Sequence, residues 1–329
     1  MTTPRRLALA CNDYDRTRAL RDGRVVPDGV ELTYLPLVVE ETFFRMMRHR
    51  EFDVAELSLS SYVLSLDDAD PPFVAIPVFP SRSFRHSSVY INRDGAIREP
   101  ADLAGGRVGL AEYQLTANVW IRGILAEHHG LPFDSVTYVT GGLEDPRRIE
   151  KRALDLPDKI RVERAPQGRC LAQMLDAGEL DAIYSPRAPS TFGQGRVVRL
   201  FDDVRSVERA YFEATRLFPI MHTIVLRRDL YEDARWLAQS LYKAFDAALG
   251  EVRAALHDTT ALRYSLPWLV AHAEETEALM GPNPWAYGLG GNVENLAAFL
   301  RYSHEQGLAR KLRAPEELFA PETLESFAL

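Results

Sequence analysis

The chain has few cysteines and no long apolar run. Only two of its 329 residues are cysteines, Cys11 and Cys170, which provide neither a disulfide framework nor the ligand spacing of a zinc site. No apolar run approaches the roughly 18 residues that a membrane-spanning helix needs. We therefore expect a reducing, cytoplasmic setting and no membrane partner.

The first residues look like a bacterial lipoprotein signal, with Arg5 and Arg6 ahead of a run that ends at Cys11. The apolar part, 7–10, is shorter than the roughly 7–15 residues of a signal's hydrophobic region. We therefore expect a first buried strand here, and no secretion. The polar turn 11–16 after this strand lies where open α/β sheets place ligand contacts, although Cys11 stands alone as a reactive side chain.

The chain also lacks an excess of basic residues. Its 39 Lys and Arg against 47 Asp and Glu give a formal net charge of -8, and no long basic run appears. This balance argues against a nucleic-acid partner. The 46% hydrophobic and 26% charged content is typical of a globular protein. Basic residues gathered in one loop of an acidic protein instead indicate a site for a small anion.

The most distinctive stretch is 79–92, where Arg82, Arg85 and His86 lie within five positions. Arginine pairs with carboxylates or phosphates through two parallel hydrogen bonds, and histidine exchanges a proton near neutral pH. The alternating run that follows predicts a strand. An exposed loop with ordinary surface charges is the alternative. A position at a strand end favours a functional loop.

Four other side chains are candidates, three at strand ends and one inside a strand. Glu56 ends one strand, and Arg187 lies in the loop after another. Glu112 opens a polar turn before a helix, an arrangement that can bind an anion through free backbone N–H groups. His222 interrupts an apolar strand, for which a buried structural role is the alternative. The charged segment 141–168 is expected to be mainly a solvent-exposed loop.

Strand and helix patterns alternate through the first two-thirds of the chain, which predicts mostly parallel sheets. Two such sets are expected, followed by one more strand and a largely helical remainder from about residue 231. This order predicts a first lobe from 1–92 and 218–329 and a second lobe from 93–217. A cleft between the lobes is the expected binding site.

Several stretches together indicate a known family. They are Phe52–Ser60, Phe79–Ser87, Arg107–Ala117, Val119–Gly123, Ser185–Arg187, Phe218–His222, Trp285 with Tyr287–Gly288, and Glu305–Leu308. With these stretches the chain resembles the 4,5-dihydroxyphthalate decarboxylases over almost its whole length. The resemblance implies a two-lobed α/β fold of the type II periplasmic-binding-protein kind, related to thiamine-precursor binding proteins, with a central cleft and a helical C-terminal region.

The activity that the resemblance implies removes one carboxylate from a dihydroxylated phthalate, giving protocatechuate and carbon dioxide without an organic cofactor. Each carboxylate has a ring hydroxyl para to it. A base that withdraws the phenolic proton pushes electron density onto the carboxyl-bearing carbon, and a general acid then protonates that carbon. The site therefore needs a cationic clamp for the second carboxylate, a proton donor and a proton acceptor.

Candidate residues exist for each role. Either His86 or His222 is the expected proton donor, and Glu112 or Glu56 the acceptor or the group that holds the catechol. The residues expected to bind substrate are Arg82, Arg85, Arg187, Glu56, Tyr113, Gln114, Thr116 and Ser185. No metal site is predicted, because nothing has the spacing of a metal motif. A facial site built from both histidines and a carboxylate is the alternative.

Three other functions stay open. A non-catalytic solute-binding or sensor protein of the same fold needs only the arginine clamp. A second alternative is a related lyase that acts on a different hydroxylated acid. A synthase in cofactor biosynthesis would need histidine or cysteine features that are not seen. A histidine beside the clamp favours an enzyme that takes a small aromatic carboxylate. The helical C-terminus could also supply a homo-oligomer interface.

Overall fold

The computed structural model describes residues 3–148 and 154–324, which group into two compact units. The first unit contains the chain up to Arg82, Ile220–Ala297 and the chain from Arg313. The second contains Ser83–Pro219 and Ala298–Leu312. None of the helices in the described ranges is long and apolar enough to cross a membrane.

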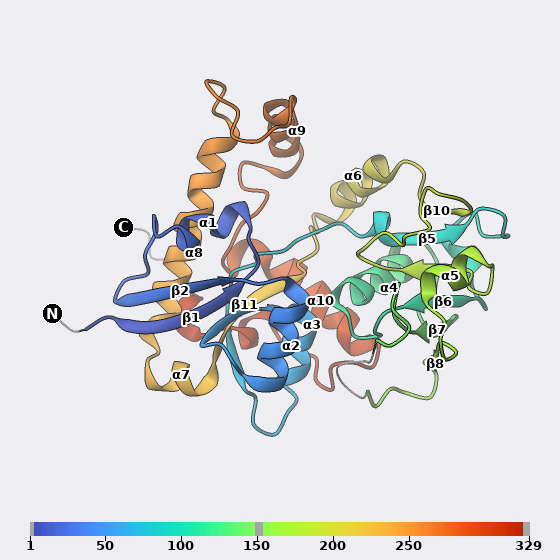
Figure 1. Ribbon diagram of the computed structural model, residues 1–329, viewed down its shortest axis with the longest axis horizontal. Helices are drawn as coiled ribbons and strands as arrows, with labels where there is room; N and C mark the ends of the chain where they lie inside the picture. The colour runs from blue at the N-terminus through green and yellow to red at the C-terminus, as the bar shows by residue number, and fades with distance from the viewer. Residues whose placement is uncertain (1–2, 149–153, 325–329) are drawn as a thin grey trace. The chain divides into compact units, whose positions relative to one another are not determined.

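The first unit is built on a five-stranded sheet with the order β2-β1-β3-β11-β4 (Figure 1). Its strands are β1 (Arg5–Cys11), β2 (Val30–Pro36), β3 (Val54–Ser58), β4 (Phe73–Ile76) and β11 (His222–Arg227). Strand β1 is parallel to β2 and β3, whereas β11 is antiparallel to β3 and β4. Strand β3 is buried along its whole length, because it lies at the centre of the sheet.

Helices connect these strands and cover the sheet. They are α1 (Asp15–Arg21), α2 (Val39–His49), α3 (Leu59–Ser65), α7 (Arg228–Asp233), α8 (Trp236–Leu256) and α9 (Leu269–Met280), with short 3-10 turns at Gly290–Asn292, Pro315–Leu318 and Pro321–Thr323. Helix α2 buries Thr42, Phe43 and Met46, which share one face at helical spacing. Helix α8 packs against α1 through a similar apolar stripe.

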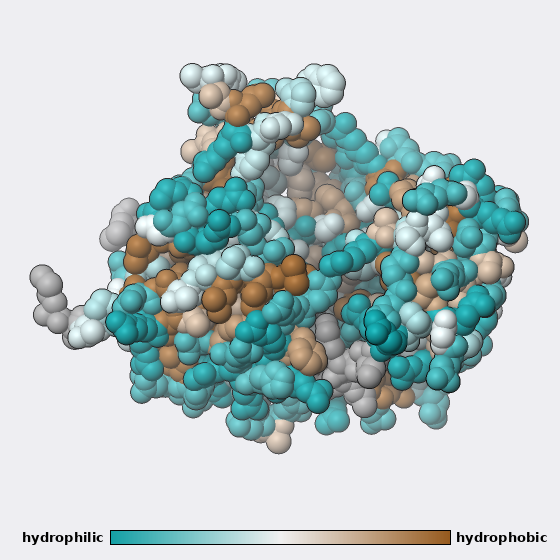
Figure 2. Space-filling view, viewed as in Figure 1, coloured by the Kyte–Doolittle hydropathy of each residue, from teal (hydrophilic) through white to brown (hydrophobic). Residues whose placement is uncertain are grey.

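The segment that contains α9 extends from the end of α8 and buries none of the residues of that helix (Figure 1). Three large apolar side chains ahead of α9 are exposed: Leu262, Leu266 and Trp268. Apolar side chains are visible at the surface of this segment in Figure 2. The segment contacts the rest of its unit through Tyr264, whose hydroxyl lies 3.4 Å from Oδ2 of Asp15.

The second unit has a six-stranded sheet with the order β10-β5-β9-β6-β7-β8. Its strands are β5 (Val89–Asn92), β6 (Arg107–Leu110), β7 (Thr137–Thr140), β8 (Arg161–Arg164), β9 (Ala182–Tyr184) and β10 (Val197–Arg199). Strands β9, β6, β7 and β8 are parallel neighbours, and β5 runs antiparallel to β9 and β10.

The helices of the second unit are α4 (Thr116–His128), α5 (Leu171–Asp176) and α6 (Val204–Thr215), with 3-10 turns at His86–Ser88 and Pro100–Leu103. Helix α10 (Val293–Glu305) begins in the first unit and continues into this one. Gly123 of α4 lies directly under the Tyr302 ring of α10, so any larger side chain there would collide with the ring. The residues of α5 complete the core with Val139 and Ile183 of the sheet.

The structure confirms the predicted α/β class with two sets of strands. Residues 228–324 are helices, turns and irregular segments, apart from an isolated β-bridge between Ala75 and Phe319. The strand at 89–92, which we assigned to the first lobe, pairs within the second sheet. The loop that precedes it belongs to the second unit from Ser83 onward. Residues 149–153 of the predicted solvent-exposed loop at 141–168 lie outside the described residues.

Candidate functional site

Three strands of the first unit bring Cys11, Glu56 and His222 to one edge of the sheet. Strands β1 and β3 are parallel and both end at this edge, and the antiparallel β11 begins there. The register pairs His222 with Ser58, and Ala10 with the residue before Glu56. Because side chains alternate between the faces of a sheet, Cys11, Glu56 and His222 share one face.

Glu56 is fully buried and lies at the centre of a hydrogen-bond network. Its Oε1 is 2.6 Å from Nδ1 of His222 and accepts the Tyr14 hydroxyl at 2.8 Å, while its Oε2 accepts the Asn12 N–H at 3.1 Å and the Cys11 thiol at 3.5 Å. Burial alone would raise the pKa of Glu56. The hydrogen bond and the charge of His222, together with the hydrogen bonds from Asn12 and Tyr14, outweigh this effect. They lower the pKa of Glu56 below its ordinary value. Glu56 is therefore ionised at neutral pH.

The His222 ring is fixed in position but remains partly exposed. Its side chain is 17% exposed, and the Phe43 ring of α2 packs edge-on against it with the centroids 4.8 Å apart. The Glu56 carboxylate fixes the tautomer that carries a proton on Nδ1. Nε2 has no hydrogen bond to any residue in the described ranges, so it is the atom that can exchange a proton with a ligand.

The hydroxyl and thiol groups around Glu56 act as donors rather than as further anions. Burial, followed by the charge of Glu56, raises the pKa of the Cys11 thiol and of the Tyr14 hydroxyl well above their ordinary values. Burial, followed by Cys11, does the same for Tyr34, whose hydroxyl donates to the Asn12 carbonyl oxygen at 2.7 Å. This edge therefore carries one stable negative charge, on Glu56, beside the His222 imidazole.

Arg82 belongs to the first unit, and its guanidinium forms hydrogen bonds within that unit. Its Nη2 donates to the Ala286 carbonyl oxygen at 2.8 Å and to the Asn292 side chain. Burial lowers the pKa of Arg82 to about 9. These contacts tie the start of the predicted anion-binding loop to the segment after α9.

The second unit gathers several predicted residues at one edge of its own sheet. Strands β6, β7 and β9 are parallel and end at this edge, and the antiparallel β5 begins there. The turn that contains Glu112 follows β6, and Ser185 follows β9. The backbone N–H of Ser185 donates to the carbonyl oxygen of Ser88 at 2.9 Å, which joins the β9 loop to the segment around His86.

Glu112 is 2% exposed, and Arg148 and Gln114 both donate to its carboxylate. Nη2 of Arg148 donates to its Oε1 at 2.9 Å, and Nε2 of Gln114 donates to its Oε2 at 3.2 Å. The sequence reasoning missed Arg148, because it lies in a charged segment that we expected to be solvated. Only the spatial meeting of the turns after β6 and β7 reveals this pair.

The other predicted binding residues have mixed surroundings. The Tyr113 hydroxyl donates to the Gln306 carbonyl oxygen at 3.2 Å, and its ring stacks on Arg122, so this side chain has a packing role. Thr116 is buried at the first residue of α4. Arg187 is exposed, and its backbone N–H donates to Oγ of Ser185 at 3.2 Å. Burial lowers the pKa of Arg85 to about 10, although Glu208 opposes this effect.

His86 lies in an aromatic cluster rather than beside a carboxylate. Its ring packs against those of His129, Phe201 and Tyr211, with centroids 5.2–5.4 Å apart. Neither ring nitrogen has a hydrogen bond to a residue that the structure describes. Burial, followed by the charges of His129 and His128, lowers the pKa of His86 to about 4. His86 is therefore neutral at pH 7.

The predicted residues thus form two groups, one in each unit. The first unit joins Glu56 to His222, and the second joins Glu112 to Gln114 and Ser185 to Arg187. Sequence reasoning did not name Asn12, Tyr14 or Arg148, although the polar turn after the first strand was a signal for the first two. Within residues 3–148 and 154–324, no three His, Cys, Asp or Glu side chains are grouped to hold a metal ion.

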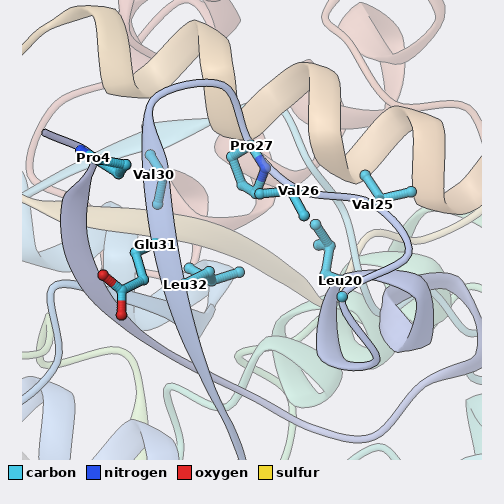
Figure 3. Close-up of a pocket in the computed structure, with 9 residues that line it drawn as sticks. Pro4, Leu20, Val25, Val26, Pro27, Val30, Glu31 and Leu32 are labelled. Carbon is cyan, nitrogen blue, oxygen red and sulfur yellow. The ribbon is translucent and has the colours of Figure 1, made fainter. Parts of the chain in front are cut away.

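A separate pocket lies at the opposite end of the first sheet (Figure 3). It has a volume of about 350 Å³ and is lined mainly by aliphatic side chains, among them Leu20, Val26 and Val30. Among its described lining residues the only charged one is Glu31, and none is an arginine, lysine or histidine that could bind a carboxylate. This pocket is therefore not a candidate site for an aromatic acid.

Comparison with solved structures defines the class of fold. The periplasmic aliphatic sulphonate binding protein SsuA of Escherichia coli matches with a TM-score of 0.55 and 15% identity, over 98% of this chain and 99% of that chain. The alkanesulfonate-binding protein SsuA of Xanthomonas axonopodis pv. citri, bound to MOPS, matches with a TM-score of 0.51 and 13% identity, over 97% and 99%. The chain therefore has the two-lobed α/β fold of the periplasmic binding proteins.

Sequence relatives define the family within that class. The chain is 43% identical over 325 residues to a 4,5-dihydroxyphthalate decarboxylase of Comamonas testosteroni, covering 98% of each chain. It is 48% identical over 210 residues to one of Pseudomonas putida, covering 63% of this chain and 81% of that one. No family model matches the chain. The chain belongs to the 4,5-dihydroxyphthalate decarboxylase family, which confirms the predicted resemblance and the prediction of a carboxy-lyase.

Proposed function

We propose that this protein converts 4,5-dihydroxyphthalate into protocatechuate and carbon dioxide. The names of its relatives support this substrate. The observation that carries the proposal is the buried Glu56 carboxylate at 2.6 Å from Nδ1 of a partly exposed His222. Such a pair holds a proton on the imidazole and delivers it from a fixed position, as ring protonation requires.

In the proposed mechanism His222 is the general acid. A base first takes the proton of the ring hydroxyl para to the leaving carboxylate, which raises the electron density at the carboxyl-bearing carbon. Nε2 of the His222 imidazolium then gives its proton to that carbon, and a C–H bond forms. The C–C bond breaks, its electron pair restores the aromatic ring and the phenolate, and carbon dioxide leaves. The base then returns its proton to the phenolate oxygen. Each turnover thus takes up one proton, which His222 regains from solvent.

No organic cofactor has to act in this sequence, because the protonated ring itself is the electron sink. Glu56 would stabilise the imidazolium and keep Nε2 directed to the substrate, as a carboxylate does for histidine in hydrolase triads. We propose Glu112 as the base at the catechol end. The residues that we propose for substrate binding in the second unit are Arg85, Arg187, Gln114, Thr116 and Ser185.

His86 is the alternative proton donor, and its surroundings favour His222 instead. A general acid must be protonated at the working pH, and the pKa of His86 is lowered to about 4 by burial. His222 by contrast has an ionised carboxylate beside it. We also propose a cytoplasmic location, which is supported by the two buried free cysteines, Cys11 and Cys170.

The test compares His222→Gln with His86→Gln, using His272→Gln on the exposed surface of α9 as the matched control. Protocatechuate and carbon dioxide are measured after incubation with 4,5-dihydroxyphthalate, and binding is measured by calorimetry. We expect kcat of His222→Gln to fall by about 10²–10⁴-fold, as for loss of a general acid, with substrate still bound. Binding without product by the unaltered protein would instead support the solute-binding or sensor alternative. A larger loss of kcat in His86→Gln than in His222→Gln would reverse our assignment of the donor.

A further inference from the structure

Arg16 lies next to the Glu56–His222 pair, and the proton-transfer mechanism above does not use it. Its guanidinium carbon lies over two aromatic rings, 4.1 Å from the Tyr14 centroid and 4.4 Å from the Trp285 centroid. The Tyr14 ring that stacks on Arg16 also donates its hydroxyl to Glu56 at 2.8 Å. One aromatic ring therefore separates the Arg16 cation from the proposed catalytic pair.

The hydrogen bonds of Arg16 fix the plane of its guanidinium and leave Nη2 available to a ligand. Its Nε donates to the Pro80 carbonyl oxygen at 2.5 Å, and its Nη1 donates to Oδ1 of Asp15 at 3.0 Å. Nη2 has no hydrogen bond to any residue in the described ranges. The side chain is 16% exposed, so Nη2 can reach a ligand.

These contacts make Arg16 a preorganised cation. The Trp285 ring is itself fixed, because its Nε1 donates to the Phe79 carbonyl oxygen at 2.9 Å. Asp15 is held by the backbone N–H of Arg16 at 2.7 Å and offsets only part of the positive charge, because it is one-third exposed. Stacking and hydrogen bonds together remove the rotamer freedom that an arginine otherwise loses when it binds an anion.

We propose that Arg16 binds the carboxylate that the substrate keeps throughout the reaction. This inference rests on the proposed function, since it names a contact for one group of that substrate. A planar guanidinium with free N–H groups matches the geometry of a carboxylate.

The chemistry of decarboxylation decides which of the two carboxylates Arg16 contacts. The leaving carboxylate loses its charge as it becomes carbon dioxide, so a strong cation bound to it would stabilise the ground state and slow the reaction. The retained carboxylate keeps its charge in the substrate, the transition state and the product. A contact made equally in all three states changes affinity but not kcat.

The experiment measures binding of three compounds together with turnover. Protocatechuate keeps the retained carboxylate, catechol has none, and 4,5-dihydroxyphthalate has both. Arg16→Met removes the charge, Arg16→Lys keeps a charge without the planar fork, and Arg21→Met on the same helix is the control. Arg21 is 39% exposed and pairs with Asp13 at the surface.

We expect Arg16→Met to lower the affinity for protocatechuate by about 10- to 100-fold, as for loss of charged hydrogen bonds. KM for 4,5-dihydroxyphthalate should rise by about the same factor. Catechol affinity and kcat should change by less than about threefold, because the contact is uniform. Arg16→Lys should lie between Arg16→Met and the unaltered protein, which Arg21→Met should resemble. If Arg16→Met does not unfold cooperatively, the same criteria apply to Arg16→Lys.

The outcomes separate this inference from the proposed function. Unchanged protocatechuate affinity in a variant of an active enzyme would overturn the inference and leave the function standing. Lower affinity for 4,5-dihydroxyphthalate with unchanged affinity for protocatechuate would assign Arg16 to the leaving carboxylate. That result would also overturn the inference. A protein that binds protocatechuate through Arg16 but releases no carbon dioxide would keep the carboxylate site and refute the decarboxylase. Failure of the unaltered protein to bind either acid would overturn both.

Discussion

Nδ1 of His222 lies 2.6 Å from Oε1 of Glu56, although the two residues are 166 positions apart in the chain. Their meeting is a consequence of backbone pairing, because β11 is antiparallel to β3 and His222 is opposite Ser58. Both side chains therefore stand on strands rather than on loops. A site built on strands holds its geometry more firmly than a site built on loops.

The first prediction concerns the charge of Glu56. Glu56→Gln keeps the size of the side chain but removes the charge and can hold the wrong tautomer of His222. We expect kcat for carbon dioxide release to fall by about 10²–10⁴-fold, as for loss of the carboxylate in a hydrolase triad. KM should change little, and calorimetric unfolding should show a single transition as in the unaltered protein.

The control for this substitution is Glu31→Gln, whose carboxylate forms an exposed ion pair with Arg6. Exposed ion pairs contribute only about 0–1 kcal/mol, so this variant should keep its full activity. Undiminished kcat in Glu56→Gln would show that the His222 ring acts without the carboxylate.

The second prediction concerns the hydroxyl of Tyr14. Tyr14→Phe removes one hydrogen bond to the Glu56 carboxylate, worth about 1.5–3 kcal/mol for a charged acceptor, and keeps the ring that stacks on Arg16. The folded-state pKa of Glu56 lies below its ordinary value of 4.5. The stability from its ionised form is therefore present above that value and is lost as the pH falls through the folded-state pKa. The destabilisation by Tyr14→Phe should accordingly be full at pH 7 and shrink at low pH.

Urea unfolding between pH 7 and pH 3 measures this effect. The matched control is Tyr138→Phe, because the Tyr138 hydroxyl donates to the backbone carbonyl oxygen of Phe133 at 2.6 Å. A carbonyl oxygen does not titrate, so the destabilisation by this variant should be independent of pH. The same pH dependence in both variants would contradict an ionised Glu56.

The sequence was informative about single residues and less so about their partners. Glu56 was predicted at a strand end and His222 inside an apolar strand, since the hydrophobic pattern marks where a strand runs. Their pairing depends on sheet register between distant segments, which no local pattern contains. Arg148 was hidden for the same reason. His86 was misleading in another way, because its arginine neighbours in the chain are not the groups that surround its ring.

The third prediction concerns stability in acid. The pKa of His86 is about 4 in the folded chain against an ordinary value of 6.5, because burial disfavours the charged ring. The unfolded chain therefore binds this proton first, and stability is lost as the pH falls from 6.5 towards 4. The loss should reach about 3 kcal/mol, since each pKa unit corresponds to about 1.4 kcal/mol.

His86→Phe should remove this loss, because Phe fits among the aromatic rings and has no proton to bind. Free energies of unfolding at pH 7.5 and pH 4.5 measure the difference, with His272→Gln as the exposed control that keeps the acid sensitivity. Equal acid sensitivity in His86→Phe and the unaltered protein would show that His86 is solvated and charged. Turnover by His86→Phe would at the same time support His222 as the proton donor.

The last prediction separates the structural role of the Glu112–Arg148 pair from its chemical role. Arg148→Met removes the ion pair between Arg148 and the buried Glu112 carboxylate. Loss of one partner costs about 3–5 kcal/mol in fully buried pairs and less here, because Arg148 is one-third exposed. Adding Glu112→Gln removes the carboxylate charge that Arg148 paired with and should restore part of that stability. The double variant should then fold normally but release no carbon dioxide, because an amide cannot accept the catechol proton. Full activity in the folded double variant would exclude Glu112 as the base. The ion pair would then have a structural role only.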